Sequence, residues 1–405
     1  MHINRVYLPM ARRHFQEDRQ MLFLSGPRQV GKTTTARALG EQFPDCTYLN
    51  WDVTEHRRLI MAGGAAVAEA ADLHRARDSA QVLILDEIHK MPGWKDLLKG
   101  LFDGWAPNLK IVVTGSAHLN VFKKGGDSLM GRYFPYRMHP LSVGEICSPA
   151  ITEGLYRARP QAPAVDDFAA LLRYGGFPEP YIRRQPRFHQ RWRRLRTELL
   201  IKEDLRDLSR TTEVARIEVL ASIMAQRAGQ LTSFASLSRQ LGVSIDTVKS
   251  WLAMLEALHY LFPVRPWHEN LSRALRKEPK YYLWDWSDVD SEGARLENLV
   301  ACALLKSVHF WTDTGMGNFA LHYIRDKEKH EVDFVVVRDG SPWFLVEVKS
   351  SRSKRLTPSL ARFQEQTAAP HAFQAVLDLE PIASDCFSYH SPTVVPLVSF
   401  LSQLI

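Results

Sequence analysis

The sequence contains little cysteine and no long hydrophobic run. Its four cysteines are scattered along the chain without the spacing of a metal site: Cys46, Cys147, Cys302 and Cys386. Isolated cysteines favour free thiols in a reducing cytoplasm over a disulfide framework. No apolar stretch is long enough to cross a bilayer, so we expect no membrane partner. The basic segment 1–13 lacks the apolar core of a signal peptide, which makes the cytoplasm the expected location.

Composition and charge limit the class of protein. With 45% hydrophobic and 24% charged residues the chain is typical of a folded globular protein, and 405 residues exceed what one core usually serves. We therefore expect two or three domains. The net charge of +7 permits binding of nucleic acid without establishing it.

The positive charge is concentrated between residues 183 and 196. This stretch carries seven arginines and no acid: Arg183, Arg184, Arg187, Arg191, Arg193, Arg194 and Arg196. One interpretation is a helix face that binds phosphates, and the other is a solvated helix beside an acidic neighbour. Charge patterning alone leaves both open.

A complete phosphate-binding loop lies near the start of the chain. It follows the apolar run 21–24 and precedes a predicted helix over 34–39. The residues expected to bind the nucleotide are Gly26, Pro27, Arg28, Gln29, Val30, Gly31, Lys32, Thr33 and Thr34. Glycines let successive N–H groups point inward around phosphate oxygens. Lys32 is expected to reach the β- and γ-phosphates and the Thr33 hydroxyl to hold Mg²⁺, which predicts ATP and Mg²⁺ as cofactors.

A second nucleotide motif follows the apolar run 82–85. Asp86 is expected to orient Mg²⁺ through its water shell, and Glu87 to polarise the water that attacks the γ-phosphate. The alternative is that these acids only cap the next helix. The next predicted strand, 110–114, offers Thr114 and Ser116 as a polar group between the two motif strands, and the sequence does not choose between them.

Arg132 precedes another predicted strand, near 136–139. From this position it could project into a neighbouring subunit's ATP site as an arginine finger. The alternative is an ordinary surface arginine in a basic chain.

Together these motifs resemble those of the AAA-type ATPases of bacteria and archaea that carry a PD-(D/E)xK-like C-terminal domain. The phrases that carry the resemblance are G-P-R-Q-V-G-K-T-T, L-D-E-I-H-K, V-T-G-S-A, G-R-Y-F-P-Y-R and L-S-V-G-E-I, with Y-G-G-F-P-E at 174–179 as the motif between the halves. The resemblance covers nearly the whole chain. It implies an α/β fold with helices on both faces of a parallel sheet over 1–160, and assembly into a ring or another homo-oligomer.

The middle of the chain is predicted to be helical. Residues 161–210 are expected to form a lid over the nucleotide and a bridging helix, and residues 211–270 a winged helix. In the latter, helices over 233–241 and 245–255 flank a turn, Ser244 caps the second helix, and 259–264 forms a wing strand. The exposed face of the second helix is only weakly basic, which favours packing between domains over DNA recognition.

The last third, 271–405, is predicted to be an α/β domain like that of restriction endonucleases. Strands over 331–337 and 343–349 form a hairpin that places Asp333 beside Glu347 and Lys349, while Glu297 approaches from a helix over 292–305. Asp333 and Glu347 would ligate Mg²⁺ or Mn²⁺. Lys349 would orient water or neutralise charge, and Glu297 would complete the metal shell or anchor Lys349. The E…D…E-x-K order matches the nuclease pattern, although Val332 stands where that pattern has proline.

These parts predict an oligomeric ATPase whose nucleotide cycle controls a metal-dependent nuclease acting on nucleic acid, in particular DNA. An alternative is an ATP-driven switch that binds nucleic acid or a partner through a catalytically inert nuclease fold. A third hypothesis, an ATP-responsive transcription regulator, is disfavoured by the poor charge of the helix-turn-helix.

Overall fold

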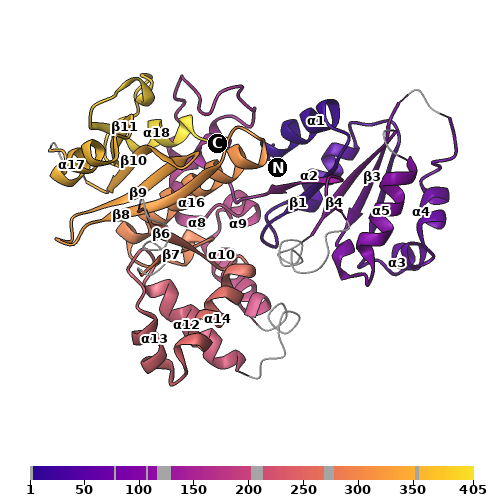
Figure 1. Ribbon diagram of the computed structural model, residues 1–405, viewed down its shortest axis with the longest axis horizontal. Coiled ribbons are helices and arrows are strands. Elements are labelled where there is room, and N and C mark those ends of the chain that lie inside the picture. Colours follow the sequence, from indigo (N-terminus) through magenta and orange to yellow (C-terminus); the bar gives the residue numbers. More distant parts are fainter. Residues whose placement is uncertain are drawn as a thin grey trace. The chain divides into compact units, whose positions relative to one another are not determined.

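The computed structural model describes residues 3–76, 79–105, 108–115, 129–201, 213–268, 278–351 and 355–405. Its chain divides into two compact units, Met1–His139 and Pro140–Ile405 (Figure 1). Ser116 lies outside the described residues. Among those that are described, no helix combines the length and the apolar character that a membrane crossing requires.

The first unit is built on a five-stranded parallel sheet in the order β2-β3-β4-β1-β5. The strands are β1 (Met21–Ser25), β2 (Cys46–Asn50), β3 (Gln81–Asp86), β4 (Leu109–Thr114) and β5 (Tyr133–Arg137). Every residue of β1 and β3 is buried, as expected of central strands covered on both faces. β5 begins earlier than the strand predicted near 136–139, because the ladder with β1 already starts at Tyr133 opposite Met21.

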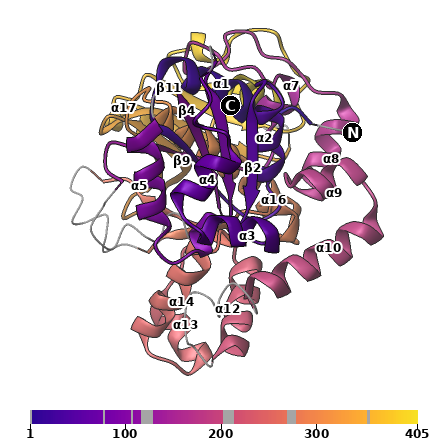
Figure 2. The same ribbon diagram turned by 90° about the vertical axis from the view of Figure 1, so that its right-hand side faces the viewer.

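Helices cover both faces of this sheet (Figures 1 and 2). They are α1 (Tyr7–Glu17), α2 (Lys32–Gly40), α3 (Thr54–Met61), α4 (Gly64–Ala70) and α5 (Trp94–Trp105). Leu83 and Leu85 share a core with α3, α4 and α5. The intervening Ile84 instead approaches Gly40 of α2. Since successive strand residues point to opposite faces, α2 covers the other side of the sheet.

The second unit contains a mixed seven-stranded sheet in the order β12-β11-β10-β9-β8-β6-β7. The strands are β6 (Leu261–Pro266), β7 (Lys280–Leu283), β8 (Phe319–Arg325), β9 (Glu331–Arg338), β10 (Ser341–Lys349), β11 (His371–Val376) and β12 (Thr393–Pro396). β9 and β10 form the predicted hairpin, and α16 (Glu292–Asp313) extends beyond the predicted helix end. α17 (Pro358–Thr367) packs Leu360 and Phe363 against one face. α18 (Leu397–Gln403) packs against α7 (Val143–Cys147).

The described part of this unit before β6 contains six further α-helices. They are α8 (Val165–Tyr174), α9 (Pro178–Arg183), α10 (Pro186–Leu199), α12 (Val214–Gln226), α13 (Phe234–Leu241) and α14 (Ile245–Ala257). The predicted cap of the last helix is confirmed, because the Ser244 hydroxyl accepts the Thr247 N–H at 3.1 Å. The predicted strand over 259–264 starts later, at Leu261, because the chain leaves α14 through His259 in a left-handed conformation. Its end pairs with β8, so it belongs to the large sheet.

Candidate functional site

The phosphate-binding loop is held in a fixed shape between β1 and α2. Gly26 has a φ of 148°, and a Cβ there would overlap the Met138 carbonyl oxygen. Gly31, with a φ of 104°, begins α2. The buried guanidinium of Arg5 donates to the Val30 carbonyl at 2.5 Å and so fixes the loop backbone at that residue. These contacts hold the loop backbone in this shape, and Arg5 is a contributor that the sequence motif did not indicate.

Lys32 and Thr33 extend from the start of α2 into this region. The Lys32 ammonium is buried and donates to the carbonyl oxygens of Gly26 at 2.9 Å and Pro27 at 2.8 Å. The Thr33 hydroxyl donates to a carboxylate oxygen of Asp86 at 2.9 Å. The two nucleotide motifs, 53 residues apart in sequence, therefore meet.

Asp86 is the buried centre of a polar cluster at the carboxyl ends of β2, β3 and β4. Besides Thr33, its carboxylate accepts from Tyr48 Oη at 2.6 Å, from Asn50 Nδ2 at 3.3 Å and from the Thr114 hydroxyl. Burial raises the pKa of the Tyr48 phenol, and the neighbouring Asp86 raises it further, so Tyr48 remains a donor. Thr114, one of the two predicted polar candidates, contacts Asp86. Tyr48 and Asn50 were not predicted.

Glu87 leaves the end of β3 in a left-handed conformation with a φ of 57°. Its N–H donates to the Thr114 carbonyl at 3.0 Å, which ties it to β4. Its carboxylate lies 3.2 Å from the Lys90 ammonium and 3.8 Å from His89 Nε2. Glu87 follows Asp86 directly in sequence, and its side chain is partly exposed to solvent. A group that polarises an attacking water needs such access.

The other residues predicted to bind the nucleotide differ in their exposure. Val30 is fully buried and anchors the loop, whereas Gln29 and Thr34 are exposed and Arg28 is half-buried. Gln29 has a φ of 63°, a left-handed conformation that helps the backbone to curl around the loop.

Arg132 lies at the other end of the parallel sheet within its own chain. It precedes Tyr133, which pairs with Met21 at the start of β1, whereas the phosphate loop follows the end of β1. Its guanidinium forms a two-pronged pair with Asp103, Nε to Oδ1 at 2.8 Å and Nη2 to Oδ2 at 2.9 Å. A role for Arg132 in a neighbouring subunit remains a prediction.

A second candidate site lies in the seven-stranded sheet, where the structure brings Asp333, Glu347 and Lys349 together. Asp333 Oδ2 on β9 accepts the N–H of Val348 at 2.8 Å. Glu347 Oε1 accepts from the Lys349 ammonium at 2.7 Å. The other oxygen, Glu347 Oε2, is buried and has no hydrogen-bond partner among the described residues. A buried carboxylate oxygen without a partner fits a site that holds a cation.

Glu297 of α16 joins this cluster together with groups that the sequence did not indicate. The Tyr282 hydroxyl on β7 donates to Glu297 Oε1 at 2.7 Å. The buried Lys280 ammonium lies 2.6 Å from Glu331 and 3.7 Å from Glu297. Lys280 and Tyr282 are two apart on one short strand and so share a face, which is the only signal that could have linked them.

The electrostatics of this acid cluster favour an additional positive charge. Burial raises the pKa of Glu297 to about 7, and the nearby Asp333 carboxylate contributes. Burial likewise raises the pKa of Glu347 to about 7, again with repulsion from Asp333. Lys280 lowers the pKa of Glu297 and Lys349 lowers that of Glu347, yet both shifts remain upward. A divalent cation with oxygen ligands fits these groups, and Asp333 and Glu347 are the residues that would hold it.

Glu347→Gln is expected to stabilise the metal-free protein near pH 8 by about 3 kcal/mol relative to its effect at pH 4. Burial raises the folded-state pKa of this carboxyl from 4.5 to about 7, so its favourable contribution is complete below pH 4.5 and is lost as the pH rises through 7. The amide removes that loss. Unfolding midpoints of both proteins with a chelator at the two pH values measure it, with Glu365→Gln on the exposed face of α17 as the control. A pH-independent difference would contradict it.

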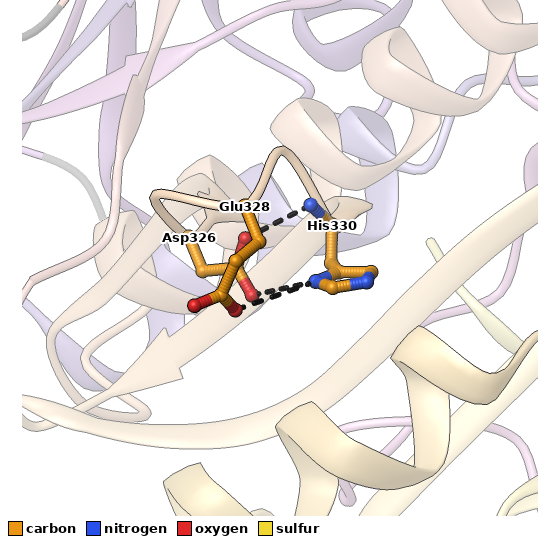
Figure 3. A group of neighbouring side chains, drawn as sticks. All are labelled: Asp326, Glu328 and His330. Carbon is orange, nitrogen blue, oxygen red and sulfur yellow. Dashed lines mark hydrogen bonds and ion pairs between the residues drawn. The ribbon is translucent and has the colours of Figure 1, made fainter.

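A further acidic group occupies the turn between β8 and β9 (Figure 3). Ligand atoms of Asp326, Glu328 and His330 lie within 4.8 Å of one another. The Arg362 guanidinium already supplies a positive charge there, 3.3 Å from Asp326 and 3.0 Å from Glu328. Since Glu328 and His330 are exposed and Arg362 pairs with the acids, we assign no metal to this turn.

Three family models match the chain in succession. The first, described as an AAA domain, matches residues 18–147. Residues 18–147 are an AAA domain. Two domains of unknown function follow, DUF8612 over 165–287 and DUF4143 over 292–386, and neither describes a nuclease. The AAA domain contains both nucleotide motifs, and such domains generally imply binding of ATP and Mg²⁺.

Related sequences and solved structures show how much of the chain has known counterparts. The chain is 25% identical over 363 residues to the uncharacterized proteins Mb2031c of Mycobacterium bovis and Rv2008c of Mycobacterium tuberculosis, covering 84% of this chain and 72% of each relative. The ORC1 protein of Aeropyrum pernix, solved with DNA, aligns at 16% identity and a TM-score of 0.32 over 73% of this chain and 90% of that one. AMPPCP-bound DnaA of Aquifex aeolicus aligns at 13% and 0.33, over 62% and 88%. At TM-scores this low, the likeness to these structures supports no functional conclusion.

Proposed function

We propose that this protein hydrolyses ATP in its AAA domain and uses the nucleotide cycle to control a metal-dependent cleavage of DNA by its C-terminal domain. The observation that carries the proposal is the convergence of Glu297, Asp333, Glu347 and Lys349 from α16, β9 and β10, with one buried carboxylate oxygen left without a partner among the described residues. Carboxylates around a lysine are the groups that metal-assisted phosphodiester cleavage requires.

In the AAA domain, each residue would have a separate task. The loop N–H groups and Lys32 would bind the phosphates, while Thr33 and Asp86 would hold Mg²⁺ directly and through water. Glu87 would accept the proton of the attacking water. Arg132 would stabilise the transferring phosphoryl group of a neighbouring subunit in a homo-oligomer, after release from Asp103.

In the acid cluster, Asp333 and Glu347 would hold Mg²⁺ or Mn²⁺. When bound, the ion supplies Lewis acidity at the scissile phosphate and lowers the pKa of a water ligand. Lys349, already hydrogen-bonded to Glu347, would stay close to the developing negative charge. Glu297 would complete the ligand set, with Tyr282 and Lys280 fixing its orientation.

The segments between the AAA domain and the C-terminal domain would connect the nucleotide site to the acid cluster. We propose a lid and bridge over 161–210, a winged helix over 211–270 and a nuclease-like domain over 271–405. The order of elements supports the winged helix, because α12, α13 and α14 are followed by the strand β6. Its antiparallel partner β7, and Lys280, which forms a bridge with Leu231, lie just beyond the proposed boundary at 270.

A binding switch without cleavage is the second candidate. The observation that favours it is the buried Lys280, whose ammonium pairs with Glu331 and approaches Glu297. A fixed lysine can neutralise carboxylates that would otherwise require a metal ion. In that case the C-terminal domain would grip nucleic acid or a partner, and ATP hydrolysis would change its affinity.

The two candidates separate in a cleavage assay. Linear and circular DNA are incubated with Mg²⁺ or Mn²⁺, with and without ATP, using wild type, Lys32→Ala and Lys349→Ala. We expect Lys349→Ala to lower cleavage by about 100-fold and to leave ATP hydrolysis intact. Lys32→Ala should abolish hydrolysis and any ATP effect on cleavage. Absence of cleavage by wild type, with hydrolysis preserved, would instead favour the switch.

A further inference from the structure

The structure divides the seven arginines of segment 183–196 into two groups. Four of them pair with acids: Arg183 with Glu179, Arg184 with Asp167, Arg193 with Asp288 and Arg196 with Asp285. These pairs lie within α8–α10 or join α10 to the segment after β7. For this group, the interpretation as a basic helix beside acidic neighbours is correct.

The other three form a separate surface, which we call the arginine ridge: Arg187, Arg191 and Arg194. All three are exposed on α10, and none has an ion pair or hydrogen bond among the described residues. Their spacings of four and three residues place them within an arc of about 60°, and over about 10 Å along the axis, of an α-helix. The buried side chains of α10, His189, Trp192 and Arg196, belong to the opposite side.

The ridge stands on a helix that is anchored to elements of the acid cluster. On the buried side of α10, His189 Nε2 lies 3.0 Å from the Ser287 hydroxyl, and Arg193 and Arg196 pair with Asp288 and Asp285. These partners lie between β7, which carries Lys280, and α16, which carries Glu297. Figure 2 shows α10 as the long helix that leads from α9 towards α12.

We propose that the arginine ridge binds the phosphate backbone of nucleic acid. Guanidinium groups without acidic partners match phosphate oxygens with two parallel hydrogen bonds each, and a row along one helix face fits a row of regularly spaced negative charges. A protein partner would require an apolar centre to the interface. Among the described residues of α10, one large apolar side chain, Leu195, is exposed, and a single exposed leucine is ordinary.

The inference rests on the proposed function only for the identity of the ligand, and binding is measured without cleavage. Fluorescence anisotropy of a labelled 30-base-pair DNA duplex, with a chelator and no ATP, gives affinity as a function of salt. Arg187→Gln, Arg191→Gln and Arg194→Gln are combined in one variant. We expect an affinity loss on the order of 100-fold and a log–log salt slope reduced by about 2.7, since each phosphate contact contributes about 0.9.

Two matched variants make the result specific. Arg12→Gln, Arg58→Gln and Arg159→Gln together remove the same charge from exposed arginines that have no partner among the described residues, and should keep the wild-type slope. Arg239→Gln with Lys249→Gln tests the exposed side of α13 and α14. Equal losses in the two triple variants, a loss confined to the α13–α14 variant, or no binding by wild type would each overturn the proposal. DNA binding that depends on the ridge, without metal-dependent cleavage, would refute only the proposed nuclease activity.

Discussion

Replacing Glu87 with glutamine is expected to slow ATP hydrolysis by about 1,000-fold while ATP stays bound. Glutamine has nearly the same shape as glutamate but cannot accept a proton from the attacking water. The groups proposed to hold the phosphates and Mg²⁺ are unchanged, because Lys32 bonds to its own loop and Thr33 bonds to Asp86. Phosphate release at saturating ATP measures the rate, and a fluorescent ATP analogue measures binding.

The structure also indicates that this variant will fold. The Glu87 carboxylate pairs with Lys90, but the same ammonium lies 2.7 Å from Asp52 and keeps that partner after the substitution. The backbone position of Glu87 depends on its N–H bond to Thr114, which the side chain does not affect. Glu41→Gln, an identical change at an exposed residue just after α2, is the control and should hydrolyse ATP normally. Wild-type turnover in Glu87→Gln would assign the water-polarising role to another residue.

The arrangement of the candidate nucleotide site was predictable because its signals are local in sequence. The loop is a contiguous motif, and the runs 21–24 and 82–85 are apolar throughout, as buried parallel strands are. Asp86 follows one of these runs directly, so its place at the carboxyl edge of the sheet followed from strand direction alone. The contact with Thr33 then required only that β1 and β3 belong to the same parallel sheet.

Residues that complete the sites from distant elements were not predictable. Arg5 reaches the phosphate loop from just before α1, and its role depends on how that segment packs below Val30. Lys280 and Tyr282 lie on a strand of four residues that are all buried. Burial therefore does not alternate along the strand, and no pattern distinguishes the face that points to the acid cluster. The pairing of β6 with both β7 and β8 decides where that strand lies, and such pairing between remote segments has no local signature.

The arginine-rich segment 183–196 was predictable only in part. The sequence indicated a basic helix but could not separate structural from free arginines, because the acids that pair with Arg193 and Arg196 lie about ninety residues further along the chain. The helical period shows which arginines share a face, but it separates the exposed face from the buried one only when the buried side of the helix is known.

Asp333→Asn is expected to lower metal-dependent DNA cleavage by at least about 1,000-fold while leaving ATP hydrolysis unchanged. An amide oxygen is a neutral and weaker ligand for Mg²⁺ or Mn²⁺ than a carboxylate. The backbone bond from Val348, at 2.8 Å, can still be accepted by the asparagine oxygen, so the hairpin should be retained. Cleavage rates over a range of Mn²⁺ concentrations, together with phosphate release, measure the two activities on one preparation.

The same substitution distinguishes the two acidic groups of this domain. Asp326→Asn, in the turn between β8 and β9, is the matched control, because it removes one carboxylate from a group that Arg362 already neutralises. We expect it to cleave at the wild-type rate. In contrast, Asp333 raises the pKa of both Glu297 and Glu347, so its removal changes the charge of the whole cluster and not one ligand alone. Loss of cleavage in Asp326→Asn, with activity kept in Asp333→Asn, would place the metal in the turn and refute the assignment to β9 and β10.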